Sequence, residues 1–343
     1  MSTPAVPTPP AQADEPVAGP VRLPIAHALN RGLRDALAGD DRVMLIGEDI
    51  GRLGGVFRVT DGLQKDFGDL RVVDSPLGEA GIVGSAIGLA MAGYRPVCEI
   101  QFDGFVFPAM NQIITQLAKY RHRSEGAVSL PVVIRIPVGG GIGAIEHHSE
   151  SPEAYFAHTA GLRVVSPSNA HEAYHLLRES IASDDPVIFL EPKRSYWLKG
   201  DVDTTVAAPA FDRAQVVHPG DDVTIVAYGA LVPAALKAAQ QYAEEGVGVE
   251  VIDLRSLSPI DDATILESVR RTGRLVVAHE ASRTAGLGAE VAARVQDEAF
   301  YSLEAPVLRV TGYDTPYPAS RLEEDWLPGV DRIVDAVDRS LEH

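Results

Sequence analysis

The chain has 343 residues, of which 45% are hydrophobic, and a net charge of -18 from 30 Lys and Arg against 48 Asp and Glu. This length and composition predict a globular protein with a large core and two domains. The acidic balance argues against nucleic acid or an anionic membrane surface as the main partner, and no run approaches the about 18 apolar residues of a membrane span.

The first 20 residues are rich in Pro and Ala and have neither a basic start nor an apolar segment. They fit neither a secretory signal nor an Arg-rich transit peptide, and we predict a disordered arm at 1–20. The single cysteine, Cys98, lies in an apolar strand-like run and is predicted to be a core thiol. Without a disulfide framework, a reducing compartment is indicated, and we expect a cytoplasmic location.

Short β-branched runs alternate with helical stretches in the first part of the chain. Strands are predicted at 42–46, 71–73, 96–102, 131–138, 162–165 and 186–190, and helices at 80–91, 108–121 and 169–182. Strands buried on both faces have continuous apolar runs, and most of these do. We therefore predict a first domain at 21–200 with a mostly parallel sheet flanked by helices.

From Lys193 the alternation of strand-like and helical segments is interrupted by Pro, Gly, Asp and scattered aromatic residues, and we predict a linker at 201–220. Ser258 is expected to cap a later helix with Pro259 at its first position. The remaining predicted elements are strands at 222–228, 249–254, 274–278 and 306–310 and a helix at 232–245. They make a second, smaller domain at 221–343, so the predicted fold class is α/β with two such domains.

One carboxylate, Glu79, stands at the start of an unusually glycine-rich predicted helix. An acidic residue in a first turn is ordinarily no more than a favourable partner of the helix dipole. Gly84, Gly88 and Ala92 recur every four residues on one face, and each internal glycine costs about 1 kcal/mol relative to alanine. Close approach of another backbone on this face would compensate that cost.

His171, Glu172 and His175 fit the pattern H-E-x-x-H, which on a helix places both imidazoles on one face with the glutamate as general base. A zinc hydrolase is therefore one functional alternative. Such a site needs a third ligand, and the nearby downstream residue Glu191 closes a predicted buried strand.

The glycine-rich run 139–143 follows a predicted strand, but it lacks a P-loop lysine and the pattern G-x-G-x-x-G. Its glycines are better explained by room for a ligand or a neighbouring segment. His147 and His148 follow, and adjacent side chains of an extended chain point to opposite sides, so at most one is expected to face a common site. Ligands of α/β sheets bind beyond the carboxyl ends of the strands, where this loop is predicted to lie.

Several segments together resemble one known family, and they are Leu45-Ile46-Gly47-Glu48-Asp49, Ser75-Pro76-Leu77-Gly78-Glu79, Glu99-Ile100-Gln101-Phe102, His148-Ser149-Glu150-Ser151-Pro152-Glu153-Ala154 and Gly312-Tyr313-Asp314-Thr315-Pro316. From about residue 21 onward the chain resembles the beta subunit of the thiamine-diphosphate-dependent decarboxylating component of 2-oxoacid dehydrogenase complexes, most closely the branched-chain type. The resemblance implies a transketolase-like pyrimidine-binding domain followed by a transketolase C-terminal domain.

The resemblance implies that Glu79 hydrogen-bonds the aminopyrimidine ring nitrogen of thiamine diphosphate. Protonation of that nitrogen favours the imino tautomer, whose own nitrogen removes the thiazolium proton. Leu77 and Gln101 match positions that line the same ring. Phe105 matches the aromatic residue that stacks on the ring, where the branched-chain proteins carry a tyrosine. Glu48 matches a second active-site acid.

His148, rather than His147, matches the family histidine that assists reductive acyl transfer to a lipoyl group. The chain lacks the Gly-Asp-Gly and paired asparagines that usually hold the diphosphate through magnesium. The resemblance implies that an alpha subunit brings this Mg²⁺ site, with the cofactor between subunits of an α2β2 heterotetramer that serves a lipoyl-bearing acyltransferase core. It also implies a structural K⁺ ion on carbonyl oxygens near 130–133 and 180–185.

The candidate K⁺ ligands in the second of these segments are the backbone carbonyl groups of Ser180, Ser183 and Asp185. The expected activity is oxidative decarboxylation of 3-methyl-2-oxobutanoate and related 2-oxoacids, with pyruvate as the alternative substrate. Two alternatives from other classes remain open: a zinc hydrolase using His171 and His175, and a non-catalytic α/β interaction subunit.

Overall fold

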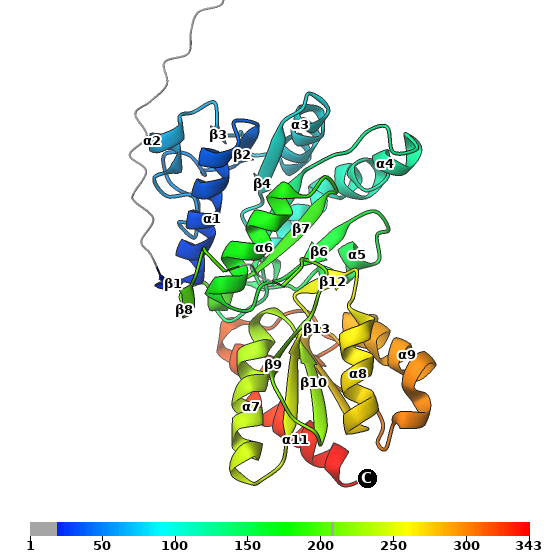
Figure 1. Ribbon diagram of the computed structural model, residues 1–343. Coiled ribbons are helices and arrows are strands. Elements are labelled where there is room, and N and C mark those ends of the chain that lie inside the picture. The colour runs from blue at the N-terminus through cyan, green and yellow to red at the C-terminus, as the bar shows by residue number, and fades with distance from the viewer. Residues whose placement is uncertain (1–18, 207–208) are drawn as a thin grey trace, which may run out of the picture.

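The computed structural model describes residues 19–206 and 209–343, so all but the last two residues of the predicted arm lie outside the described residues. A seven-stranded sheet fills the upper half of Figure 1 and a five-stranded sheet the lower half, and helices flank both. This is the predicted α/β fold with two sheet-centred halves. No helix in the described part of the chain is long and apolar enough to cross a membrane.

The larger sheet has the strand order β12-β6-β7-β5-β4-β2-β3. Its strands are β2 (Val43–Gly47), β3 (Val72–Asp74), β4 (Arg95–Glu99), β5 (Val133–Val138), β6 (Arg163–Val165), β7 (Val187–Pro192) and β12 (Ser256–Ser258). All neighbours run parallel except β12, which is antiparallel to β6. The six predicted strands of the first domain are found as β2 to β7, although the strand predicted at 96–102 ends at Glu99 and the one predicted at 131–138 begins at Val133. Buried parallel strands carry the continuous apolar runs on which the prediction rested.

Helices cover both faces of this sheet. One face packs against α1 (Ile25–Gly39) and α6 (Ala170–Ala182), and the other packs against α3 (Glu79–Met91). Alternate strand residues enter the two cores: Val97 joins the α1–α6 side and Cys98 the α3 side. Cys98 is fully buried, as predicted, and burial raises the pKa of its thiol to about 12.

The predicted helix at 108–121 is wrong as a single α-helix. The chain forms a 3₁₀ segment, η1 (Asp103–Ala109), a π-helical segment, η2 (Asn111–Leu117), and one short turn, α4 (Tyr120–Arg123). Pro108 lies inside η1 and has no N–H to donate, which prevents a regular α-helical ladder there. Further short elements of this half are α2 (Leu63–Phe67), η3 (Glu146–His148), α5 (Glu153–Ala157) and η4 (Lys193–Ser195).

The smaller sheet has the order β14-β13-β10-β11-β9, in which only β9 is antiparallel to its neighbour. Its strands are β9 (Gln215–His218), β10 (Val223–Ala227), β11 (Val249–Asp253), β13 (Leu275–Ser282) and β14 (Leu308–Gly312). Because β9 falls inside the predicted linker at 201–220, this sheet starts earlier than expected. A separate antiparallel pair joins β1 (Val21–Pro24) to β8 (Lys199–Val202).

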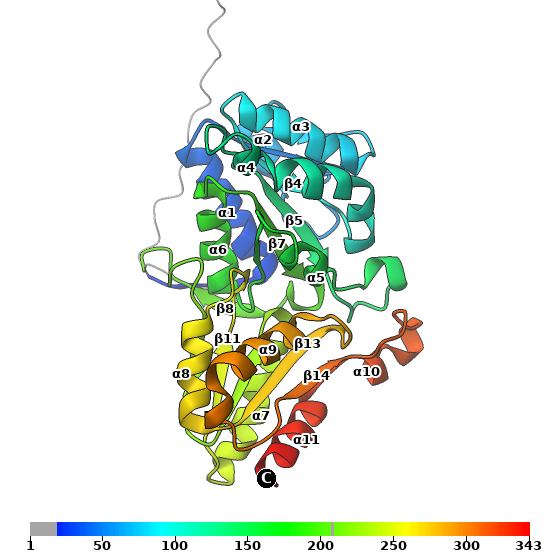
Figure 2. The ribbon, with the colours of Figure 1, turned by 90° about the vertical axis from the view of Figure 1, so that its right-hand side faces the viewer.

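Helices α7 (Val232–Glu244) and α11 (Val330–Leu341) pack on one face of the smaller sheet, and α8 (Asp262–Thr272) and α9 (Leu287–Ala299) on the other (Figure 2). The remaining short elements are η5 (Gly229–Leu231), η6 (Phe300–Ser302), η7 (Ser320–Leu322) and α10 (Glu323–Trp326). The core between α8, α9 and the sheet is continuous with the core of the larger sheet on its α3 side.

The predicted helix cap at Ser258 is wrong, because Ser258 belongs to β12 and pairs with Val164 of the larger sheet. The helix begins later, where the Asp261 carboxylate accepts a hydrogen bond from the Thr264 N–H at 3.3 Å. A carboxylate is a good N-cap, and Asp261 takes this role because strand pairing holds Ser258 in β12. β12 thereby joins the second half of the chain to the first sheet.

The glycine-rich run 139–143 makes room for a neighbouring segment, one of its two predicted roles. The backbone N–H groups of Gly141 and Gly143 donate to the Glu323 carboxylate at 2.8 and 3.0 Å, and that of Gly140 donates to Glu280. A side chain at Gly140 would overlap the Tyr317 hydroxyl group. The loop is therefore held by the second half of the chain.

Glu153 makes a second polar contact between the two halves. Its carboxyl group accepts a hydrogen bond from the Tyr228 hydroxyl at 2.7 Å and is 3% exposed. Burial raises the pKa of Glu153 from 4.5 to about 7. The hydrogen bond from Tyr228 lowers this pKa, and the negative charge of Glu280 raises it further. The folded protein thus favours the protonated acid, and this stabilisation is lost as pH rises through about 7.

Glu153→Gln, which keeps the shape and removes the charge, is expected to gain stability relative to the natural chain as pH rises. Between about pH 5.5 and 8.5 the difference in unfolding free energy should move in favour of the variant by about 1–2 kcal/mol. Urea unfolding at both pH values measures it. A difference that stays constant with pH contradicts a protonated Glu153.

Candidate active site

The site lies at the carboxyl ends of parallel strands in the larger sheet. Glu48 follows β2, Gln101 follows β4, and Glu79 opens α3 a few residues after β3. These three strands are neighbours, in the order β4-β2-β3. Since ligands of α/β sheets bind beyond the carboxyl ends of the strands, the predicted residues gather at the edge where a ligand is expected.

Glu79 is the most buried carboxyl group of this cluster. It is the first residue of α3 and is 8% exposed, whereas an ordinary first-turn acid is solvated. Burial raises the pKa of the nearby Glu48 carboxyl group, and the charges of Glu79 and Asp49 raise it further. A carboxyl group whose pKa is raised beside a second, buried carboxyl group suits general acid–base chemistry.

Gln101 is joined to the Glu48 segment by hydrogen bonds. Its side-chain amide donates to the Glu48 carbonyl oxygen at 3.4 Å and to the Asp49 carboxylate at 3.3 Å. Asp49 has a left-handed φ of 58°, a conformation that costs energy in a residue other than glycine and often marks functional sites. Sequence reasoning did not single out Asp49. Leu77, a predicted ring-lining residue, is 80% exposed and stands open to solvent.

His148 and Phe105, two of the predicted site residues, lie in one aromatic cluster. The His148 ring stacks on Phe102 at 4.0 Å between ring centroids, and the Phe105 ring meets it edge-on at 5.1 Å. The expectation that His147 points to the opposite side is wrong: both histidines lie in the 3₁₀ turn η3, and their rings are 4.3 Å apart. A 3₁₀ turn lacks the side-to-side alternation of an extended chain.

A buried ion pair that sequence reasoning missed lies beside this aromatic cluster. The Lys193 ammonium group pairs with the Asp103 carboxylate, and both side chains are fully buried. Lys193 Nζ also lies 5.8 Å from the centroid of the Phe102 ring, and Asp103 accepts a hydrogen bond from the Glu150 N–H at 2.7 Å. The pair therefore fixes η1 to the histidine loop. In the sequence, the one indication of this ion pair was an acidic residue, Asp103, directly after Phe102.

The arrangement fits one end of a flat heteroaromatic cofactor. A buried carboxyl group can hold a proton at a ring nitrogen, an amide can hold a second polar group, and aromatic side chains can cover a ring face. These are the groups that an aminopyrimidine ring requires.

The H-E-x-x-H segment does not form a zinc site with an available base. The Glu172 carboxylate is buried and accepts a hydrogen bond from Arg255 Nε at 2.5 Å. His175 Nε2 donates to the Asp203 carbonyl oxygen at 2.8 Å, although the His171 and His175 rings are close, at 4.3 Å. Within residues 19–206 and 209–343, no three His, Cys, Asp or Glu side chains are arranged to hold a metal ion.

The candidate K⁺ ligands Ser180, Ser183 and Asp185 lie where α6 ends and the chain turns into β7. This turn precedes β7, so it lies at the amino ends of the parallel strands, away from Glu79 and His148. A cation bound in this turn would stabilise the fold and would not take part in catalysis.

Comparison with known proteins places the fold and the family. The transketolase pyrimidine-binding domain matches residues 22–197, and the transketolase C-terminal domain matches 212–333. A solved structure, "Split gene transketolase, inactive beta4 tetramer", has the same fold, with a TM-score of 0.78 and 24% identity over 93% of this chain and 98% of that one.

Two curated relatives are similar over almost the whole chain. The "Pyruvate dehydrogenase E1 component subunit beta" of Leifsonia xyli subsp. xyli is 63% identical over 93% of this chain and 95% of its own length. The "3-methyl-2-oxobutanoate dehydrogenase subunit beta" of Mycobacterium tuberculosis is 54% identical over 97% of both chains. With its two transketolase domains, the chain belongs to the family of thiamine-diphosphate-dependent 2-oxoacid dehydrogenase beta subunits.

Proposed function

We propose that this chain is the beta subunit of a branched-chain 2-oxoacid dehydrogenase that oxidatively decarboxylates 3-methyl-2-oxobutanoate and related 2-oxoacids. The observation that carries the proposal is the burial of Glu79 beside Glu48 at the carboxyl ends of the strands. Thiamine diphosphate, when bound, supplies the carbon nucleophile and takes up the electrons released by decarboxylation.

The residues of this chain handle protons and orient the ring. Glu79 holds a proton at the ring nitrogen of the aminopyrimidine, which makes the exocyclic nitrogen a base. Glu48, whose pKa burial raises, exchanges that proton with Glu79. Gln101 and Leu77 line the ring and Phe105 covers one face. Phe105 has no hydroxyl group, so its contribution is limited to stacking.

The proposal requires a second protein. An alpha subunit brings the Mg²⁺ and diphosphate site, so activity appears only in an α2β2 assembly, which acts in the cytoplasm. The outer face of α3 suits that contact, because a Cβ atom added at Gly81 or Gly88 meets no other atom within 4 Å, and Leu77 beside it is exposed. In Figure 2, α3 lies along the upper edge of the molecule, where another subunit can approach.

We propose that His148 assists acyl transfer to the lipoyl group of the acyltransferase core. His148→Ala is therefore expected to lower the rate of reductive lipoyl acylation by about 100-fold or more. Decarboxylation measured with an artificial electron acceptor should stay within a few-fold of the natural rate. His147→Ala is the matched control, since its ring is 4.3 Å away. Equal effects of the two variants on lipoyl acylation contradict the assignment.

Pyruvate is the second candidate substrate, because the relative at 63% identity is named a pyruvate dehydrogenase subunit. The pair of this chain and its alpha subunit should be assayed for kcat/KM on pyruvate and on the branched-chain 2-oxoacids. A preference of at least about tenfold, or 1.4 kcal/mol, for the branched-chain acids is expected. Higher kcat/KM on pyruvate overturns the branched-chain assignment but leaves the family activity intact.

A further inference from the structure

The C-terminal end of α6 needs a cation that its own sequence does not supply. The last carbonyl groups of a helix have no intrahelical partners, and the helix dipole makes this end negative. The last turn of α6 carries no basic residue, and two acidic residues, Asp184 and Asp185, follow its C-cap residue Ser183. Negative charge therefore accumulates in the turn that leads into β7.

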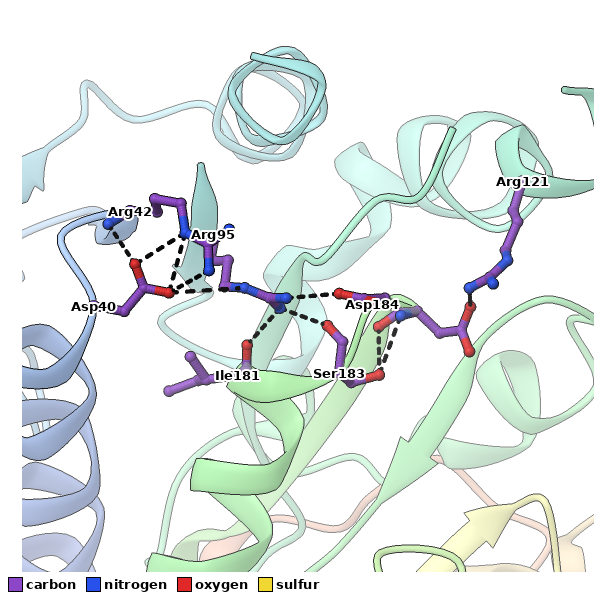
Figure 3. Close-up of polar contacts among 8 residues, drawn as sticks. Asp40, Arg42, Arg95, Arg121, Ile181, Ser183 and Asp184 are labelled. Carbon is purple, nitrogen blue, oxygen red and sulfur yellow. Dashed lines mark hydrogen bonds and ion pairs between the residues drawn. The ribbon is translucent and has the colours of Figure 1, made fainter. Parts of the chain in front are cut away.

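Arg95, the first residue of β4, supplies this cation from a distant part of the chain (Figure 3). Its Nη1 donates to the carbonyl oxygens of Ile181 at 3.1 Å and Ser183 at 3.0 Å, and its Nη2 pairs with the Asp184 carboxylate at 2.6 Å. The Arg95 side chain is 15% exposed and its contacts with the two carbonyl oxygens are partly buried, whereas the Asp184 carboxylate is solvent-exposed. One planar guanidinium group thus binds two helix-end carbonyl oxygens and one carboxylate.

The second acidic residue of the turn is neutralised as well. The Asp185 carboxylate pairs with Arg121 and lies 3.4 Å from Arg163 Nη2. Behind Arg95, the Asp40 carboxylate binds Arg42 at 2.8 Å and lies 4.0 Å from Arg95 Nε. Arginine side chains of this chain therefore meet both carboxylates of the turn.

The carbonyl groups of Ser180, Ser183 and Asp185, named for a K⁺ ion, already accept hydrogen bonds within the chain. The Ser183 carbonyl accepts from Arg95, that of Asp185 accepts from the Ser183 hydroxyl at 3.1 Å, and that of Ser180 accepts from the Ser183 N–H at 3.3 Å. A dehydrated K⁺ ion needs several carbonyl oxygens turned toward it in place of its water shell. An ion on Ser183 would also stand beside the Arg95 guanidinium, and like charges so close repel.

We propose that Arg95 is the built-in cation of the α6–β7 turn and that the chain holds this turn without a bound monovalent metal ion. The turn lies at the opposite end of the strands from Glu79, so the contact stabilises the fold and takes no part in proton transfer. This inference is independent of the proposed substrate and partner.

The test is thermal unfolding of the full chain in KCl and in choline chloride at equal ionic strength. The natural chain should unfold at the same temperature in both salts. Arg95→Met should unfold several degrees lower in choline chloride, since one kcal/mol corresponds to about 2–4 °C in chains of this order of size. Arg42→Met is the matched control, because Arg42 binds Asp40 but none of the carbonyl groups of the turn, and it should shift far less.

Saturable stabilisation of the natural chain by K⁺ over choline overturns the inference, as does an Arg95→Met chain that unfolds like the natural one. If Arg95→Met does not fold, Arg95→Lys, which keeps the charge without the planar fork, should show an intermediate loss. The salt comparison on the natural chain decides the metal question without any variant.

Discussion

Glu79→Gln is expected to lower kcat for thiamine-diphosphate-dependent decarboxylation by about 10²–10⁴-fold in the assembled enzyme. The amide has nearly the shape of the carboxyl group, and it can still contact a ring nitrogen. It cannot hold and return a proton there, so the step that depends on the protonated aminopyrimidine fails. Because Glu79 is 8% exposed, solvent water has little access to replace it.

The control for this loss is Glu290→Gln, which changes the first-turn acid of α9. A helix-dipole role for Glu79 predicts equal, small effects of the two variants on stability and none on kcat. Circular dichroism and the mass of the assembled complex show whether Glu79→Gln folds and binds its partner. If the assembled Glu79→Gln enzyme has the same kcat as the unmodified enzyme, Glu79 has no role in proton transfer.

Arg135→Met is expected to lower the free energy of unfolding by about 3–5 kcal/mol, because it leaves buried carboxylates without their partner. Arg135, 2% exposed, donates to Glu99 at 2.6 Å and to Glu191 at 2.7 and 2.9 Å, and the Tyr196 hydroxyl completes the group. Burial raises the pKa of Glu99 despite the opposing charge of Arg135. These side chains join β4, β5 and β7 below the site.

Arg294→Met gives the matched comparison, since Arg294 also binds two carboxylates, those of Glu290 and Asp262 at 2.8 Å, but is 39% exposed. Its loss should cost less than about 1 kcal/mol. Urea unfolding of both variants measures the difference. If Arg135→Met loses no more stability than Arg294→Met, the buried ion-pair network does not stabilise the sheet.

Glu99 precedes Gln101 by two residues, so a loss of order at the end of β4 should also disturb the position of Gln101 in the site.

The sheets were predictable because their strands are buried on both faces, but individual boundaries depended on distant partners. The strand predicted at 186–190 continues to Pro192 in β7. Glu191 looked like the end of a strand because it is charged. Its carboxylate is neutralised by Arg135, 56 residues earlier in the chain, and no local pattern reveals that pairing.

Two further differences have the same origin. Ser258 had the sequence of a helix cap, yet pairing with Val164 across the chain holds it in β12. The sequence around Lys193 looked like the approach to a linker, yet its ammonium group is buried on Asp103, 90 residues away. In both places a long-range partner overrides a local signal.

The site itself was identified by resemblance rather than by spacing. Glu48, Glu79 and His148 follow β2, β3 and β5, while Gln101 and Phe105 both follow β4. Only the parallel order of β3, β2, β4 and β5 brings these four segments to one edge. Leu77 is unlike the other predicted site residues: its side chain is 80% exposed, and packing within this chain does not explain its position.

The most direct test is thiamine-diphosphate-dependent release of CO₂ from 3-methyl-2-oxobutanoate by this chain mixed with its alpha subunit. Neither subunit alone should release CO₂ above background, and the mixture should do so with Mg²⁺ and thiamine diphosphate present. Release by this chain alone, or no release by the assembled pair from any 2-oxoacid, would contradict the account, and the second result would leave a non-catalytic interaction subunit.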